Sequence, residues 1–177
     1  MKDAIESPPQ RFDRMKTSIR RNIGIGEMIV VRSGEGTVST HAVGSCIAVC
    51  VFDPSTAVAA MLHFLLPEAK INPARAEANP AVFADTGIPL LFQTAYRHGL
   101  VKARAIVKLV GGAEMPSNTT GTFNTGQRNL LAARNLLWRN GVFVAAEDVG
   151  GTDARTVHMS AVDGRLQVFS GRSFKEL

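Results

Sequence analysis

Short apolar runs separated by turn residues extend from about Ile23 to the end of the chain, and this pattern predicts strands and helices in alternation. Residues such as Val, Ile, Thr and Phe in these runs favour strands. The expected strands are residues 28–32, 37–40, 46–52, 57–66, 103–110, 142–146, 156–162 and 165–169. We expect the first two to pair with each other, and Asp163-Gly164 predicts a hairpin between the last two.

Two other segments have helical spacing. Asp85 or Thr86 can cap a helix that has Pro89 in its first turn and ends at Gly99. A second helix is expected at about residues 127–140, followed by a terminating glycine. The pattern as a whole predicts an α/β (α+β) sandwich, with a mixed, largely antiparallel sheet and two main helices.

The length of 177 residues suits one domain, which we place at residues 23–177. Residues 1–22 are predicted to form a flexible basic arm, because the segment is non-periodic and contains two prolines. The six basic and three acidic residues of this arm account for most of the net charge of +5, so the nearly neutral body argues against nucleic-acid binding. No apolar run is long enough to span a bilayer, and the N-terminus lacks a signal peptide. We therefore expect a cytoplasmic protein without membrane insertion.

Residues 46–52 and 57–66 are apolar on both alternating faces, which predicts two strands that are buried on both sides. Asp53 to Thr56 has the composition of the turn between them. With this turn, Cys46 lies directly opposite His63. Opposite residues of an antiparallel pair have Cβ atoms about 4.5–5.5 Å apart, so a thiol and an imidazole could interact there.

This juxtaposition indicates nucleophilic catalysis by Cys46. A free cysteine thiol has a pKa of about 8.5, and a neighbouring imidazole such as that of His63 can take its proton. Gly44 and Ser45 precede the nucleophile and are the candidate oxyanion or substrate loop, because a glycine lets backbone N–H groups approach closely. Cys50 is interpreted as a buried inert thiol. A disulfide to Cys46 is excluded, since four residues along a strand span about 13 Å.

Metal and cofactor chemistry have little support in the sequence. The four histidines are scattered, and neither they nor the two cysteines show the paired spacing of a zinc site. We therefore expect no metal.

The segment from Thr40 to Pro67 resembles the signature of the chemoreceptor glutamine deamidase family CheD, with a Thr, a Gly-Ser-Cys, and a His followed by an apolar stretch and Pro. Other parts of residues 23–170 also look like that family. They are Phe83 to Thr86, Gly111 to Ala113 with Met115, Asn124 to Gly126 with Arg128-Asn129, and Ala146 to Gly151 with Arg155-Thr156. The chain departs from the family at Pro116 and in its longer basic N-terminal arm.

The resemblance implies an α/β sandwich similar to the catalytic domain of the cytotoxic necrotizing factor toxins, with a Cys-His-Thr triad. Carried over by position, the nucleophile is Cys46, the base is His63 and the third member is Thr40. Spacing alone does not choose Thr40 over its neighbours Ser39 and His41, either of which can orient an imidazole.

The implied reaction converts glutamine side chains of chemoreceptors to glutamate through a thioester, with release of ammonia, and it needs no cofactor. Implied partners are the cytoplasmic helices of chemoreceptors and, in some bacteria, a CheC-type phosphatase. An alternative is a non-enzymatic adaptor that binds a receptor or a CheC-type phosphatase, but intact Cys46, His63 and Thr40 argue against a vestigial site. A thiol redox protein is disfavoured, because no second cysteine can reach Cys46 in the expected strand.

Overall fold

The computed structural model describes residues 19–32, 36–114 and 124–177. Their strands form two five-stranded sheets. The first sheet has the order β1 (Arg20–Ile23), β3 (Thr37–Val43), β8 (Arg155–Ser160), β9 (Leu166–Ser170) and β10 (Ser173–Glu176). The second has the order β2 (Glu27–Arg32), β5 (Val58–Phe64), β4 (Ile47–Asp53), β6 (Ile106–Gly111) and β7 (Val144–Val149).

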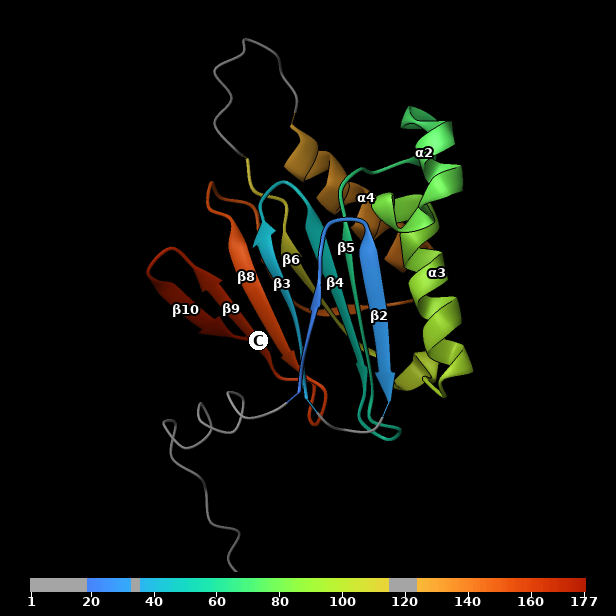
Figure 1. The fold of residues 1–177 in the computed structure, drawn as a ribbon, viewed down its shortest axis with the longest axis vertical. Helices are drawn as coiled ribbons and strands as arrows, with labels where there is room; N and C mark the ends of the chain where they lie inside the picture. Colours follow the sequence, from blue (N-terminus) through green and yellow to red (C-terminus); the bar gives the residue numbers. More distant parts are fainter. Residues whose placement is uncertain (1–18, 33–35, 115–123) are drawn as a thin grey trace, which may run out of the picture.

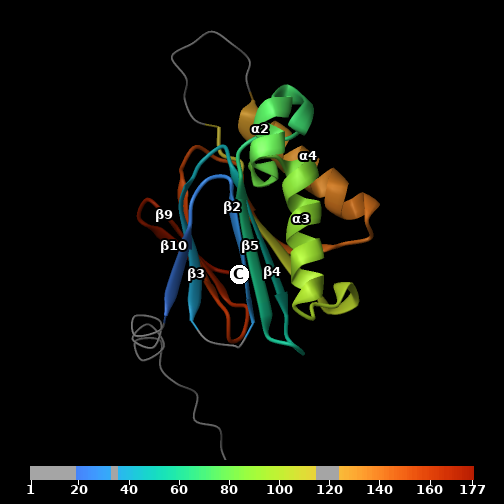
Figure 2. The ribbon, with the colours of Figure 1, turned by 45° about the vertical axis from the view of Figure 1, so that its right-hand side comes forward.

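The helices cover one face of the second sheet, and the first sheet covers its other face (Figures 1 and 2). The main helices are α3 (Ala84–Arg97) and α4 (Thr125–Arg139), accompanied by the short helix α2 (Pro73–Ala78). Three turns of 3₁₀-helix complete the elements of the described residues: η1 (Ala69–Ile71), η2 (Pro80–Val82) and η3 (Lys102–Arg104). The second sheet is thus the middle of three layers.

The middle layer explains why two strands are apolar on both faces. Every residue of β4 and β5 is buried. Along β4, Val49 belongs to the apolar cluster under the helices, whereas Cys50 belongs to the cluster between the two sheets. A strand with both faces covered loses the alternation of apolar and polar residues that marks a strand with one face in water.

The predicted α/β class with mixed strand directions and two main helices is confirmed, as is the hairpin at Asp163-Gly164. The strands β2 and β3 do not pair, however, contrary to expectation: β2 pairs with β5, and β3 pairs with β1 and β8. The two consecutive strands therefore belong to different sheets.

Helix α3 begins at Ala84, one residue before the expected caps, so Pro89 lies inside the helix rather than in its first turn. The carboxylate of Asp85 does not cap the helix. It accepts two hydrogen bonds from the backbone N–H of Ala69 instead, at 2.9 and 3.0 Å. A tertiary contact has replaced the local cap that the sequence suggests.

Strand β1 starts at Arg20, within the segment expected to be an arm, and pairs in parallel with β3. The rest of the predicted arm, residues 1–18, lies outside the described residues. Within the described ranges, no helix combines the length and apolar composition needed to cross a membrane.

Candidate active site

The hairpin of β4 and β5 brings Cys46 and His63 to one face of the second sheet, although its register differs from the predicted one. Ala48, and not Cys46, lies opposite His63. The prediction was wrong by two residues because Asp53 continues the strand and pairs with Val58, so the turn begins one residue later. A shift of two residues keeps side chains on the same face. Cys46 immediately precedes β4 and packs in the same cluster between the sheets as Ala48, the residue opposite His63.

His63 meets Thr40 across the space between the two sheets. The Oγ1 atom of Thr40, on β3, lies 2.8 Å from Nδ1 of His63, on β5. The same hydroxyl donates a hydrogen bond of 2.9 Å to the carbonyl of Ile23. Both side chains are completely buried, at 0% exposure.

These two contacts determine which nitrogen of His63 carries the proton. A threonine hydroxyl has one hydrogen, and the carbonyl of Ile23 can only accept it. Thr40 must therefore accept a hydrogen bond from Nδ1–H of His63. In the neutral imidazole the proton is then on Nδ1, which leaves the lone pair of Nε2 available as a base.

The Cys46 thiol and the His63 imidazole are both neutral near pH 7. Burial lowers the pKa of His63 from 6.5 to about 4, and burial raises the pKa of the Cys46 thiol from 9.0 to about 11. Nε2 of His63 is buried and makes no hydrogen bond to any described residue, the Cys46 thiol included. The arrangement thus supplies a thiol and an unprotonated base on one face, rather than a preformed ion pair.

The turn that leads to Cys46 is shaped by an irregular backbone. The pairing of β3 with β8 is interrupted between Thr40 and Val43, and Ala42 has the left-handed φ of 55°. Such conformations are costly for residues other than glycine and are enriched at functional sites. Gly44 and Ser45 follow at the turn into β4.

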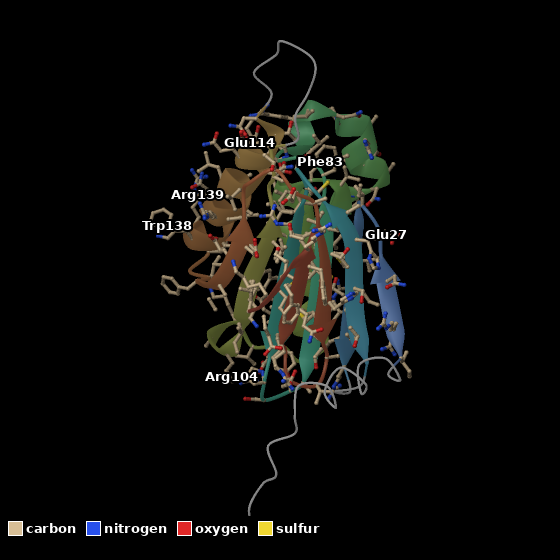
Figure 3. The ribbon with its side chains drawn as sticks, turned by 90° about the vertical axis from the view of Figure 1, so that its left-hand side faces the viewer. Glu27, Phe83, Arg104, Glu114, Trp138 and Arg139 are labelled. Atoms are coloured by element: carbon tan, nitrogen blue, oxygen red, sulfur yellow. The ribbon has the colours of Figure 1, made fainter. Side chains whose placement is uncertain are left out.

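Two glycines at the end of β6 let the chain approach Cys46 closely. The N–H of Gly112 donates to the carbonyl of Cys46 at 2.8 Å. A Cβ atom on Gly111 would lie 2.2 Å from that carbonyl oxygen, closer than real Cβ contacts allow. The turn into β4 and the end of β6 meet at the end of the molecule where Phe83 and Glu114 lie, opposite the end that holds Arg104 (Figure 3).

Sequence reasoning did not assign a role to Asn129, which the structure places beside the peptide that joins Ser45 to Cys46. Its Nδ2 atom donates to the carbonyls of Ser45 and Leu65, both at 2.8 Å. The signal in the sequence is the buried stripe of α4, where Asn129 falls among Gly126, Ala133 and Leu137. A polar residue on the buried face of an amphipathic helix needs a partner inside the protein.

The alternative third members lie elsewhere. Ser39 Oγ is 2.7 Å from Nδ1 of His158, and the ring of His41 packs edge-on against that of His158. Of the three consecutive candidates, Thr40 is the one in contact with His63. Cys50 is fully buried, and burial raises the pKa of its thiol to about 12.

No group of three or more metal-ligating side chains occurs among the described residues.

Comparison with known proteins gives consistent matches. A family model described as CheD chemotactic sensory transduction matches residues 65–170, a segment that begins just after His63 and contains Asn129. A protein of Solibacter usitatus (strain Ellin6076) named "Probable chemoreceptor glutamine deamidase CheD" is 41% identical over 155 residues, which are 88% of this chain and 91% of the relative. A probable chemoreceptor glutamine deamidase of Syntrophus aciditrophicus (strain SB) is 38% identical, over 88% of this chain and 97% of the relative. A similarly named protein of Pyrococcus abyssi (strain GE5 / Orsay) is 37% identical, over 82% of this chain and 88% of the relative. The chain therefore belongs to the CheD family.

Proposed function

We propose that this protein is a chemoreceptor glutamine deamidase in which Cys46 is the nucleophile, His63 the base and Thr40 the residue that orients His63. The relatives named as probable chemoreceptor glutamine deamidases support the substrate and the reaction. The assignment of these three residues rests on one observation, the surroundings of the two nitrogen atoms of the His63 imidazole. Its Nδ1 is held by Thr40, and its unpaired Nε2 shares a sheet face with Cys46.

In the proposed reaction, the sulfur of Cys46 attacks the side-chain amide carbon of glutamine while Nε2 of His63 takes the thiol proton. The carbonyl oxygen becomes an oxyanion. The tetrahedral intermediate then breaks its C–N bond, the imidazolium gives its proton to the leaving nitrogen, and ammonia departs from a thioester. Water, deprotonated by Nε2 of His63, hydrolyses the thioester, yielding glutamate and restoring the thiol.

The neutral resting state suits this scheme. A base with a pKa of about 4 is unprotonated at neutral pH, and proton transfer can accompany attack instead of preceding it. The missing hydrogen bond between Cys46 and Nε2 has a simple explanation, since catalytic hydrogen bonds are often long before substrate binds. We infer that the thiol approaches Nε2 in the substrate complex.

We propose that the substrate is the cytoplasmic helices of chemoreceptors, that the protein works in the cytoplasm, and that a CheC-type phosphatase is a partner. A fold similar to the catalytic domain of the cytotoxic necrotizing factor toxins is likewise proposed, on the basis of the family resemblance.

The test is mass spectrometry of receptor fragments incubated with the protein. Each deamidation raises the fragment mass by about one unit, because NH₂ is exchanged for OH. Cys46→Ser should abolish the shift, whereas the matched variant Cys50→Ser should keep most activity, because Cys50 lies deep in the sheet with no role in the scheme. Equal loss in both variants would remove Cys46 from its role. Binding of wild-type protein without a mass shift would favour the adaptor function.

A further inference from the structure

Asn129 is the polar side chain that α4 buries completely, and it reaches the two strand ends that flank the nucleophile. Its exposed fraction is 0%. The carbonyl of Ser45 precedes Cys46 in the chain, and the carbonyl of Leu65 lies two residues beyond His63. The last regular pair of the hairpin is Ile47 with Phe64, so the carboxamide binds both strands just where their ladder ends.

The orientation of the carboxamide follows from its partners. Both are carbonyl oxygens, which only accept, so the NH₂ group of Asn129 must face them and use both of its hydrogens. Its own oxygen, Oδ1, is buried without a hydrogen-bond partner among the described residues. Leaving a buried acceptor unpaired destabilises the folded protein. A residue that serves stability alone would not require this arrangement, which points to a role at the site.

The hydrogen bond to Ser45 fixes the peptide that joins Ser45 to Cys46. In a trans peptide the C=O and N–H groups point in opposite directions. With the carbonyl held by Asn129, the N–H of Cys46 faces away from α4. No backbone carbonyl of the described residues accepts a hydrogen bond from this N–H outside the regular strand ladders. The N–H lies on the thiol side, where its own sulfur is within reach as a hydrogen-bond acceptor.

We propose that Asn129 is a positioning residue that holds the Ser45–Cys46 peptide so that the Cys46 N–H binds the oxyanion formed during deamidation. This inference rests on the proposed function. Donors that are fixed before the reaction stabilise developing charge without reorganising, and loss of one such donor typically lowers kcat by about 10²–10³. Asn129 acts one step away from the reacting atoms, through the orientation of this donor.

The experiment compares deamidation with alkylation of Cys46 by iodoacetamide. Alkylation needs the same thiol but forms no oxyanion. We expect Asn129→Ala to lower kcat for a receptor fragment by about 10- to 100-fold, with KM and the alkylation rate within about 3-fold of wild type. Asn135→Ala, at an exposed position of the same helix, is the matched control and should change none of these quantities.

A smaller change guards against loss of the fold. Asn129→Ser keeps one donor and should give an intermediate kcat, with a circular dichroism spectrum like that of wild type. A parallel fall in kcat and alkylation rate would show a general structural role and overturn the proposal, as would an unchanged kcat.

A second readout separates this inference from the proposed function. In ¹⁵N NMR spectra, Asn129→Ser should shift the Cys46 amide resonance and Asn135→Ala should not, whether or not the protein deamidates receptors. An inactive wild type with this amide shift would refute the proposed function alone. An active wild type whose Cys46 resonance is unmoved by Asn129→Ser would refute the role of Asn129 alone.

Discussion

The hydroxyl of Thr40 lies 2.8 Å from Nδ1 of His63 in the closed space between two sheets. Each residue comes from a different sheet, so the contact forms only when the two sheets pack together. Because the same hydroxyl donates to Ile23, it also fixes the tautomer of the imidazole. One buried threonine thus links the packing of the sheets to the basicity of Nε2.

Replacement of Thr40 should therefore impair catalysis without removing a reacting group. Thr40→Val keeps the shape of the side chain but loses the hydroxyl, so the tautomer is no longer selected. We expect turnover to fall by about 10- to 1000-fold, corresponding to about 1.4–4 kcal/mol, which is less than the loss in Cys46→Ser. Thr40→Ser should retain much of the rate in the mass-shift assay.

The neighbouring residues provide controls for Thr40. Ser39→Ala also removes a buried hydroxyl from β3, but that hydroxyl pairs with His158, so deamidation should stay within a few-fold of wild type. His41→Ala should likewise have little effect. An inactive His41→Ala together with a fully active Thr40→Val would reassign the third member.

The sequence predicts those contacts of the site that depend on neighbouring residues in the chain, and it does not predict contacts between residues that lie far apart in the chain. The side chains of a strand alternate with a period of two, so Cys46 and His63 were placed on a common face although the register was wrong by two residues. The turn itself was misplaced because Asp53 fits a turn as well as a strand end. Its carboxylate is held by Arg104, and its pKa is lowered to about 2, an interaction between residues distant in the chain.

The contributions of the first sheet and of α4 could not be predicted from local patterns. The choice among Ser39, Thr40 and His41 depends on how β3 faces β5 across the core. Asn129 lies 84 residues from Ser45 in the sequence, and no spacing rule relates the two. Such contacts are determined by the packing of layers, which the alternation of apolar residues specifies only in outline.

The buried imidazole should make the protein sensitive to acid. The pKa of His63 is about 4 in the folded protein and near 6.5 when exposed, so below pH 6.5 the unfolded chain binds the proton more readily. Folding stability is therefore lost as pH falls from 6.5 towards 4, by about 3 kcal/mol at most at 1.36 kcal/mol per pKa unit. Urea denaturation of wild type and His63→Gln across this range should show a shallower decline in the variant. Parallel curves would contradict the burial of a neutral imidazole.

The thiol should respond to pH in the alkaline range. Burial raises the pKa of Cys46 to about 11, so the thiolate fraction, and with it the rate of iodoacetamide alkylation, should still be rising at pH 9. In His63→Ala, alkylation near neutral pH should be slower, because the proton has lost its acceptor. Alkylation that reaches a plateau near pH 7 would instead reveal a preformed ion pair, and identical rates in both proteins from pH 6 to 8 would exclude His63 as the base.

The close approach of β6 to Cys46, the proposed nucleophile, gives a prediction that a second glycine can control. A methyl group on Gly111 would meet the carbonyl of Cys46 at 2.2 Å, and the φ of 119° at this position is strained for alanine. Gly99 shares the strain, with φ of 98°, but a Cβ there would contact nothing within 4 Å. Gly99→Ala should therefore cost about 1–3 kcal/mol of folding free energy for the strain, with activity retained.

Gly111→Ala should cost an additional ~1–3 kcal/mol for the steric overlap. It should also lose deamidation at temperatures where the fold persists, because Cys46 is displaced from His63 by the movement of its own carbonyl. Thermal unfolding and the mass-shift assay on the two variants measure both effects. If Gly111→Ala loses no more stability than Gly99→Ala and remains active, the backbone around Cys46 tolerates movement, and close packing against β6 is not what holds the nucleophile in place.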